Sequence, residues 1–540
     1  MMVKLANELE GREVFNIAML VDSAAQRWGE RVAIYHYETG KTVSYREVAE
    51  MAGRVGNALR SLGVEIEDRV AILMDDCPEW AFALFGSLKI GSVVMPLNPL
   101  LTGKDYAFFL ADSRARVLFV GADHFNKIED ILPSLPYLKQ VVVCNGGGFG
   151  GRGGRVVDWE AFTRAPKELE VEPTFSTDLA LFAYTSGSTG RPRAIMHSHH
   201  NLGGSSPTFD FYNIVEGDIQ FHIPKLYFLT TFGGFIRTFR FGCPIVLLSG
   251  RPLGSTVLEV IARYRPNFLA GAPTVFARMV EAAKEAPHLA DLSSVRYIFC
   301  TGEALTREVF QRFQETFGKA LYNCWGAQEV SSAPLSWRHD DEVPLEKVGS
   351  AGKSPLPWCE VRIVDERGED VPRGVPGEIM IKIDSLFLGY WHEPQEAARK
   401  IVEGWYKPGD SFMQDEEGYY WYRGRLDDMV KVGGRQLCPV EIEETVARHP
   451  AVAENAVIPV KNEYGLTELQ AFVVVNDSYS PSPELASQIR DFVKEELAPF
   501  KRPGRVEFVS ELPRTGTGKI QRFRLREQAL GEERKDEIGQ

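Results

Sequence analysis

The chain lacks the patterns that mark disulfide frameworks, zinc sites and nucleic-acid binding. Its seven cysteines are scattered, with no CxxC motif and no close pair, which favours reduced thiols in a cytoplasm and argues against structural zinc. A net charge of −13 speaks against nucleic acid or an anionic membrane as a partner, because such binding needs basic surface. Anionic ligands would therefore need local positive sites.

Long hydrophobic runs are also absent. The most apolar stretch, residues 79–101, is interrupted by Lys89, Pro96 and Pro99 before it reaches membrane-spanning length. The first sixteen residues are too charged for a signal peptide and contain no continuous apolar region. What the chain does have is 540 residues with 44% hydrophobic and 11% aromatic content, which predicts a folded globular protein with a large core and no membrane insertion.

A glycine-rich segment, "YTSGSTGRPR" at 184–193, comes after an apolar run that ends at Ala183. A loop of this kind leaving a strand usually holds phosphates, but it lacks the GK[ST] step of a P-loop. The later "GTGKIQ" (516–521) has isoleucine where that motif needs a hydroxyl. No GxGxxG joins a strand to a helix early in the chain, which argues against a dinucleotide-binding dehydrogenase. Hydroxyls, amides and arginines together suit a departing pyrophosphate better than transfer of a γ-phosphate.

Strand and helix patterns alternate over 44–121 and again over about 178–330, which predicts parallel sheets covered by helices. After residue 350, short turn-rich strands predict a small β-subdomain, and from 427 the helices and strands predict a compact α+β domain. The segment 144–155 has seven glycines in twelve residues. No helix pattern comes after it, so a flexible surface loop is the better interpretation.

Several motifs in a fixed order carry a family resemblance. They are the loop at 184–193, "TGEAL" (301–305), "NCWGAQE" (323–329), "GWYKPGD" (404–410), "YRGRLDDMVKVGGRQLCPVEIE" (422–443) and "PRTGTGKIQR" (513–522). This set resembles the adenylate-forming superfamily of acyl-CoA synthetases, luciferases and adenylation domains. The segment "PKLYFLTTFGGF" (224–235) is similar to that of benzoate-CoA ligases and related aryl-CoA ligases. The resemblance implies an α/β fold: an N-terminal domain (1–426) of two mostly parallel sheets wrapped by helices plus a small β-barrel, and a small mobile α+β C-terminal domain (427–540).

The resemblance implies that a carboxylic acid attacks ATP to give an acyl-adenylate and pyrophosphate, after which coenzyme A takes the acyl group. Lys519 would bridge the carboxylate and the α-phosphate, and Glu329 would hold the Mg²⁺ that organises the phosphates. Arg193 would contact phosphate from the end of the loop. The other residues expected to bind ATP or AMP are Thr185, Ser186, Gly187, Ser188, Thr189, Gly190, Gly302, Glu303, Ala304, Asn323, Cys324, Trp325, Gly326, Gln328, Asp410, Tyr422 and Arg425. Asp410 is expected to accept both ribose hydroxyls, and Trp325 either lies against adenine or is an ordinary core residue.

The two half-reactions need different groups in one place, so the resemblance implies rotation of the C-terminal domain about Asp427. Rotation would withdraw Lys519 and bring in Lys431, Gly433 and Gly434, where a pantetheine arm passes close to the backbone.

The sequence departs from the family pattern at four positions of the nucleotide site: Arg193 replaces the usual lysine, Ala194 a glycine, Trp325 a tyrosine, and Gln328 a threonine. Arginine keeps the charge but contacts oxygens through a planar fork. The histidines of "HSHH" (197–200) come after the phosphate loop in many relatives without binding metal, so we do not expect a metal there.

Phe228, Thr231 and Ala272 are expected in the acyl pocket, where the branched Thr231 would narrow it for a compact aromatic or small branched acid. Two alternatives stay open: an adenylation enzyme that loads a carrier protein, and a catalytically weak nucleotide-binding homologue. A homodimer is compatible with the sequence.

Overall fold

The computed structural model forms two compact units. One comprises Met1–Val361 and Ile381–Tyr406, and the other Arg362–Met380 and Lys407–Gln540. The residues that the structure describes are 14–151, 154–185, 192–204, 209–353, 356, 358–426, 430–432, 435–437, 439–461, 467–476, 478–498, 501–514, 520–522 and 524–529. Lys519, Asp427, Gly433, Gly434 and the loop residues Ser186, Gly187, Ser188, Thr189 and Gly190 lie outside them. The second unit already includes the residues from Lys407 onward. The proposed hinge at Asp427 therefore stays a prediction.

The first unit contains two large sheets. One has the strand order β18-β9-β8-β4-β3-β5-β6-β7. These strands are β18 (Gly389–Tyr390), β9 (Arg193–Ser198), β8 (Leu179–Thr185), β4 (Val93–Pro96), β3 (Arg69–Leu73), β5 (Val117–Gly121), β6 (Gln140–Cys144) and β7 (Val156–Asp158). The strands from β8 to β7 are parallel, whereas β9 and β18 extend the sheet antiparallel. The fully buried run of β5 shows why these strands are apolar throughout: both faces of a parallel sheet are covered.

The other large sheet has the order β15-β14-β13-β12-β10-β11-β1-β2. Its strands are β15 (Ser332–Ser336), β14 (Tyr322–Ala327), β13 (Tyr297–Cys300), β12 (Phe268–Gly271), β10 (Gln220–His222), β11 (Ile245–Leu247), β1 (Val32–His36) and β2 (Thr42–Ser44). All neighbours from β14 to β1 are parallel. The predicted pair of mostly parallel sheets is therefore confirmed.

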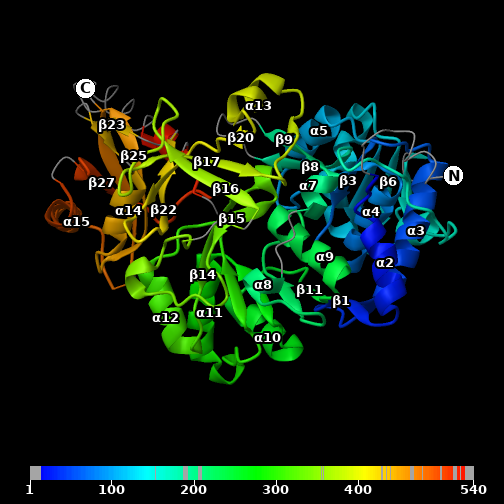
Figure 1. Cartoon of the computed structure of the whole chain (residues 1–540), viewed down its shortest axis with the longest axis horizontal. Coiled ribbons are helices and arrows are strands. Elements are labelled where there is room, and N and C mark those ends of the chain that lie inside the picture. Colours follow the sequence, from blue (N-terminus) through cyan, green and yellow to red (C-terminus); the bar gives the residue numbers. More distant parts are fainter. Residues whose placement is uncertain are drawn as a thin grey trace. The chain divides into compact units, whose positions relative to one another are not determined.

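Helices cover both sheets. Helices α2 (Met19–Trp28), α3 (Tyr45–Ser61) and α4 (Pro78–Lys89) lie side by side (Figure 1). Helix α3 begins with a capping box, in which the Ser44 hydroxyl accepts from the Glu47 amide at 3.1 Å and the Glu47 carboxylate accepts from the Ser44 amide at 2.7 Å. The first unit also contains α5 (Gly103–Asp112), α6 (Trp159–Phe162), α7 (His199–Gly204), α8 (Phe209–Tyr212), α9 (Leu229–Phe241) and α13 (Pro394–Lys400).

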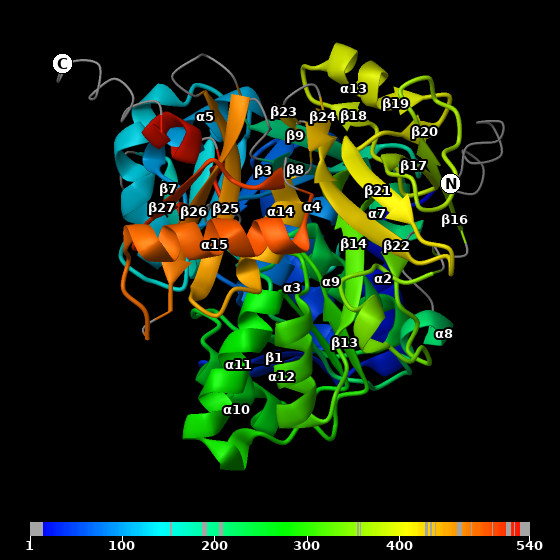
Figure 2. The ribbon, with the colours of Figure 1, turned by 90° about the vertical axis from the view of Figure 1, so that its left-hand side faces the viewer.

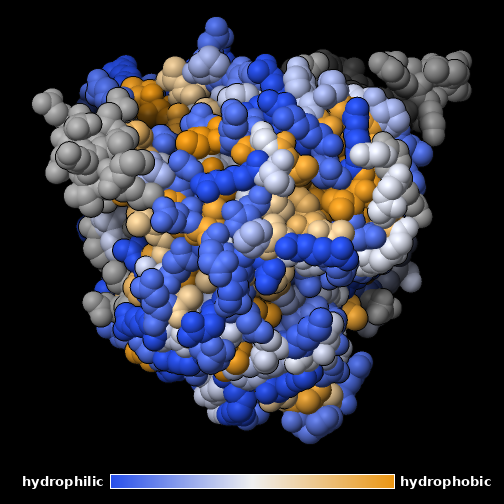
Figure 3. All heavy atoms as spheres, turned by 90° about the vertical axis from the view of Figure 1, so that its right-hand side faces the viewer, coloured by the Kyte–Doolittle hydropathy of each residue, from blue (hydrophilic) through white to orange (hydrophobic). Residues whose placement is uncertain are grey.

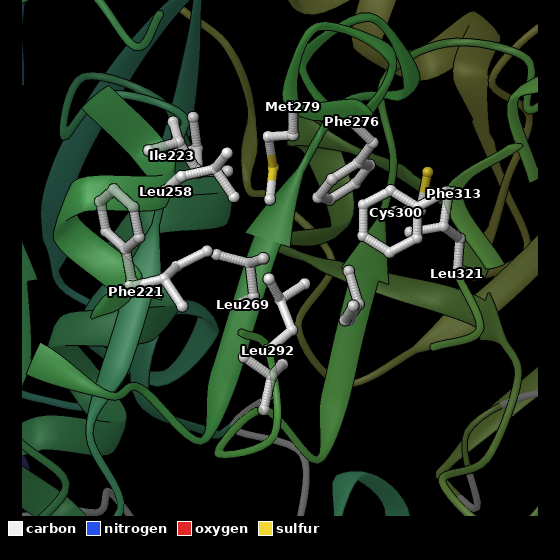
Figure 4. Close-up of a cluster of buried hydrophobic side chains, with 14 of the residues drawn as sticks. Phe221, Ile223, Leu258, Leu269, Phe276, Met279, Leu292, Cys300, Phe313 and Leu321 are labelled. Carbon is white, nitrogen blue, oxygen red and sulfur yellow. The ribbon is translucent and has the colours of Figure 1, made fainter. Parts of the chain in front are cut away.

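Helices α10 (Gly254–Tyr264), α11 (Pro273–Glu285) and α12 (Arg307–Phe317) lie next to one another beside β13 (Figure 2). Their apolar stripes pack on one face of the second sheet. Phe221 and Leu269 from its strands lie in one buried cluster with Leu258 of α10 and with Met279 and Phe276 of α11 (Figure 4). Because side chains alternate along a strand, the neighbours of Phe221 and Leu269 face the opposite side of this sheet, where α9 lies.

A six-stranded antiparallel sheet stands where a small β-barrel was expected. Its path is β19-β20-β17-β21-β22, with β16 paired to β17, and among the described strands it is open. The strands are β16 (Cys359–Val364), β17 (Gly377–Ile383), β19 (Ile401–Val402), β20 (Trp405–Tyr406), β21 (Asp410–Gln414) and β22 (Tyr420–Arg425). In β17, Ile381 pairs with Tyr406 in the first unit, and Gly377 pairs with Phe412 in the second.

The rest of the second unit confirms the predicted α+β domain. The hairpin β23 (Val430–Val432) and β24 (Arg435–Leu437) precedes α14 (Pro439–Ala447). A three-stranded sheet of β25 (Val452–Lys461), β26 (Thr467–Val475) and β27 (Arg505–Phe508) packs with α14 and α15 (Pro483–Glu496) around Ile442, Val457 and Ile489.

The surface drawn in Figure 3 is hydrophilic over most of its area, with hydrophobic residues in patches between. No helix among the described residues has both the length and the hydrophobicity needed to cross a bilayer.

Candidate active site

The glycine-rich loop joins two neighbouring antiparallel strands. Strand β8 ends at Thr185 and β9 begins at Arg193, and these two residues face each other in the ladder. The strand predicted before the loop is confirmed, and the loop leads into a second strand and not into a helix. A P-loop leads from a strand into a helix whose N-terminus holds the phosphates, so this connection between two strands is not a P-loop.

Arg193, at the end of this loop, is held by two carboxylates. Its Nε lies 2.9 Å from Glu393 Oε2 and its Nη1 lies 3.2 Å from Glu396 Oε1. The guanidinium carbon also lies 5.9 Å from the centre of the Tyr390 ring. Arg193 is only 15% exposed as a side chain, so these charged contacts are poorly screened by water. The structure thus places Arg193 where the sequence predicts it, while its contact with phosphate stays a prediction.

Glu329 lies in a short turn, η5 (Gln328–Val330), directly after β14. Its Oε1 accepts a hydrogen bond of 2.9 Å from the Tyr390 hydroxyl, and its carbonyl accepts one of 2.7 Å from the Phe387 amide. Burial and the charge of Glu329 raise the pKa values of Tyr390 and Tyr406 well above the ordinary range. Both phenols therefore stay protonated, and Tyr390 stays a donor. Tyr390 consequently links Glu329, through its hydroxyl, to Arg193, beside its ring.

The turn that carries Gln328 and Glu329 is anchored to β9 by a buried histidine. His197 Nδ1 lies 3.1 Å from the Ser331 hydroxyl, and Ser331 has a left-handed backbone with φ of 51°. The Ser385 hydroxyl donates to the Val330 carbonyl at 2.6 Å. Burial lowers the pKa of His197 to about 3, so this imidazole is neutral at physiological pH.

His199, the third residue of the "HSHH" segment, is also buried. Its Nδ1 accepts a hydrogen bond of 3.2 Å from the Ile17 amide, and burial lowers its pKa to about 4. Across the part of the chain that the structure describes, no group of three or more His, Cys, Asp and Glu side chains converges as a metal cluster would.

The "TGEAL" residues come after β13 at the carboxyl end of the second sheet. Gly302 is exposed, with φ of +96°, a conformation that favours glycine. The Thr301 hydroxyl donates to the Cys324 carbonyl at 3.1 Å, which fixes this turn to β14. Glu303 Oε1 lies 3.5 Å from the Thr274 hydroxyl, and Ala304 is exposed.

Strand β14 brings the "NCWGAQE" residues to the same edge. Asn323 donates its side-chain amide to the carbonyls of Gly349 at 2.9 Å and Ser350 at 3.1 Å, and the Cys324 thiol is buried 2.8 Å from the Ser336 hydroxyl. These two side chains therefore stabilise the fold, whereas the side chains of Trp325 and Gln328 are half-buried.

Gly326 lies so close to β15 that a Cβ there would stand 2.3 Å from the Ser332 carbonyl oxygen. This contact gives the glycine of the motif a packing reason besides ligand binding.

The predicted acyl-pocket residues lie near the same edge. Phe228 is the N-cap of α9 and is half-buried. Thr231 is buried and turns its hydroxyl to the Pro224 carbonyl at 2.6 Å, so its hydroxyl is bonded within its own segment. Ala272 is the half-buried N-cap of α11, directly after β12. Their role in binding an acid stays a prediction.

In the second unit, Asp410 and Arg425 are cross-strand partners on β21 and β22. Arg425 Nη1 lies 2.7 Å from Asp410 Oδ1 and 3.0 Å from the Pro408 carbonyl oxygen. Tyr422 lies farther along β22, with its ring 5.6 Å from that of Phe412. Lys431 is the middle residue of β23, opposite Gln436. The structure thus brings together Asp410, which is predicted to bind the ribose hydroxyls, and Arg425, which is predicted to support the ribose or phosphate.

The sequence interpretation missed the residues that position Arg193 and Glu329. Tyr390, Glu393 and Glu396 lie far along the chain from Arg193, and their segment "LGYWHEPQE" (388–396) belongs to none of the motifs named above. Ser331 and His197 likewise carry no sequence signal for their contact. A carboxylate-rich helix start such as that of α13 was the one available signal.

The fold and this arrangement define a class: ligases of the adenylate-forming type, with a glycine-rich connection between β8 and β9, a fixed glutamate and a separate C-terminal domain. The comparisons agree. The model of the "AMP-binding enzyme" family matches residues 21–391, and that of the "AMP-binding enzyme C-terminal domain" matches residues 441–519.

Among curated relatives, the 3-hydroxybenzoate–CoA ligase of Aromatoleum sp. (strain CIB) is 36% identical over 490 residues, which is 90% of this chain and 92% of the relative. The benzoate–CoA ligase of Thauera aromatica is 34% identical over 507 residues, covering 93% of each chain. Among solved structures, the anthranilate CoA ligase AuaEII in complex with anthranoyl-AMP superposes with a TM-score of 0.86 at 34% identity, covering 96% of this chain and 97% of that one.

The chain belongs to the AMP-binding enzyme family. It is an AMP-forming ligase that joins a carboxylic acid to a thiol and uses ATP and coenzyme A. The predicted resemblance to benzoate–CoA ligases is confirmed.

Proposed function

We propose that this enzyme activates an aromatic carboxylic acid as its adenylate and transfers the aryl group to coenzyme A. The relatives act on benzoate-type acids, as their names state. The observation that carries the proposal is the linked set of Arg193, Tyr390 and Glu329, which fixes a cation and an anion beside the β8–β9 hairpin. A triphosphate needs this pairing, because its charge must be screened and its metal ion held.

Each described residue of this set has a role in the proposal. Glu329 supplies the carboxylate for Mg²⁺, which binds ATP enzymes through one or two carboxylates and the phosphates themselves. Tyr390 keeps that carboxylate in place. Arg193 offers charge to departing pyrophosphate while Glu393 and Glu396 orient its fork. Thr185 contributes the first hydroxyl of the loop, and Gln328 donates an amide hydrogen to the α-phosphate.

The second unit supplies the ribose contact and the exchange of groups. Asp410 accepts hydrogen bonds from the two ribose hydroxyls, while Arg425 orients the Asp410 carboxylate through its hydrogen bond to Oδ1. Lys519, Asp427, Gly433 and Gly434 lie outside the described residues. Their roles as catalytic lysine, hinge and pantetheine channel are part of the proposal on the strength of the motifs alone.

The cellular setting completes the proposal. We propose a cytoplasmic enzyme that acts as a homodimer and has no nucleic-acid partners. The six described cysteines are buried and free, which supports a reducing compartment. Size-exclusion chromatography with light scattering measures the oligomeric state.

The test is acid-dependent exchange of labelled pyrophosphate into ATP over a panel of aromatic, branched and fatty acids, with and without coenzyme A. We expect exchange to be fastest with benzoate-type acids and aryl-CoA to form when coenzyme A is added. Exchange without thioester would move the acceptor to a carrier protein, and no exchange with any acid would contradict the proposed activity.

A further inference from the structure

A charged side chain is buried in the first unit without a carboxylate partner. Arg237 on α9 is 6% exposed. Its Nε donates to Gln220 Oε1 at 2.7 Å and its Nη2 to His222 Nε2 at 3.0 Å. Its guanidinium lies 5.0 Å from the centre of the Phe268 ring. Both hydrogen-bond partners are neutral, and among the described residues no carboxylate forms an ion pair with it.

The charge of Arg237 persists despite its burial. Burial lowers the pKa of this guanidinium to about 10, so it is still protonated at neutral pH. A buried cation without a counter-charge is costly, because neutral dipoles replace its hydration only in part. Such a residue is expected where a ligand supplies the missing charge or acceptor.

The surroundings of Arg237 are fixed and leave donors without acceptors. Gln220 donates its amide to the Cys243 carbonyl at 2.9 Å, which turns its oxygen toward Arg237. Because arginine only donates, His222 Nε2 must accept, and the neutral ring then carries its proton on Nδ1. That Nδ1 is buried and has no partner in the described structure. Arg237 Nη1 also has no acceptor among the described residues, but unlike His222 Nδ1 it is not fully buried.

Arg237 lies on the helix that contains the end of the predicted acyl segment. Thr230, Gly233 and Arg237 share one stripe of α9, at helical spacing. Along this stripe Thr230 is exposed, Gly233 is half-buried and Arg237 is buried. A Cβ placed on Gly233 would stand 3.8 Å from Arg237 Nη1. Because glycine has no side chain, nothing at position 233 covers Nη1 on the side that faces Thr230.

We propose that Arg237 determines substrate specificity by binding an oxygen acceptor, a hydroxyl or a second carboxylate, that the aromatic acid carries on its ring. This inference rests on the proposed function and names its substrate class. An acid with that oxygen satisfies the free Nη1 donor, and a carboxylate also balances the charge. An unsubstituted acid or one with a methyl group leaves both unsatisfied.

The test compares acids that differ in one ring substituent: benzoate, and benzoates with a hydroxyl, a carboxylate or a methyl group at the same position. The variants are Arg237→Gln and Arg237→Lys. The matched control is Arg240→Gln, an exposed arginine on the same helix whose hydrogen bond is to the Gly203 carbonyl. The readouts are kcat/KM for adenylate formation and calorimetric affinity for each acid.

We expect Arg237→Gln to lower kcat/KM and affinity for the oxygen-bearing acids by about 10- to 100-fold, with little change for benzoate and its methyl derivative. Arg237→Lys should keep part of the preference, and Arg240→Gln all of it. Equal loss for every acid, or no loss for any, would overturn the proposal. If the wild type forms no adenylate at all, the proposed function fails, and the affinities still decide the role of Arg237.

Discussion

The hydroxyl of Tyr390 offers a direct test of how Glu329 is held. Replacing Tyr390 with phenylalanine removes the hydrogen bond of 2.9 Å to Glu329 Oε1 and leaves the ring in place against Phe387, whose centre lies 4.8 Å away. A hydrogen bond to a charged group contributes about 1.5–3 kcal/mol. If Glu329 acts only when it is positioned, the loss in kcat/KM for MgATP is about 10- to 100-fold.

Measuring the two half-reactions separately, and each as a function of pH, distinguishes a loss of Glu329 positioning from a general loss of structure. Because burial and Glu329 raise the pKa of Tyr390, the phenol does not ionise in the neutral range, and the loss should be the same from about pH 6 to pH 9. Thioester formation from supplied acyl-adenylate should change little. The control is Tyr37→Phe, which removes a comparable bond to Glu259 at a distant exposed site. An unchanged KM for MgATP and unchanged kcat in Tyr390→Phe would show that this hydrogen bond does not position Glu329.

Three further predictions concern His197, Gly326 and Lys519. Burial lowers the pKa of His197 in the folded protein to about 3, against an ordinary 6.5. The free energy of unfolding therefore has its full contribution from His197 above pH 6.5 and loses up to about 1.4 kcal/mol per pH unit below it. Between pH 6.5 and pH 3 the melting temperature of His197→Gln should decline less steeply than that of the wild type, and parallel curves would contradict this. Gly326→Ala puts a Cβ 2.3 Å from the Ser332 carbonyl oxygen and should cost about 1–3 kcal/mol in thermal unfolding, whereas Gly147→Ala, with open space around it, should not. Lys519→Ala should lower the rate of adenylation about 100-fold or more but leave thioester formation from supplied acyl-adenylate unchanged. The control is Lys494→Ala, at an exposed lysine. Equal loss of both steps would contradict the proposed hinge.

Much of the fold could be predicted because its strands are buried on both faces. Residues 69–73 and 117–121 form strands inside apolar runs, and the helix pattern after residue 44 became α3. The pairing of strands that lie far apart in the chain could not be predicted. Strand β1 lies early in the chain yet pairs with β11, because parallel pairing joins segments far apart in sequence.

The sequence predicted the motif residues of the candidate site but not the residues that hold them in position. Arg193 and Glu329 stand out because glycine-rich and acidic motifs surround them. Tyr390 and Glu396, which hold them, are distant in sequence and belong to residue types that are common on any surface. Arg237 could not be found either, since the sequence does not distinguish it from Arg240 on the same helix, and only the structure shows that Arg237 is buried with neutral partners.

The proposed function requires that the enzyme makes an aryl-adenylate on the way to a thioester. The decisive measurement is mass spectrometry of the products formed from ATP, an aromatic acid and Mg²⁺, first without and then with coenzyme A. We expect an aryl-AMP ester in the first case, and aryl-CoA with equimolar AMP and pyrophosphate in the second. Acid-dependent formation of ADP and phosphate would contradict it, because those products require attack on the γ-phosphate.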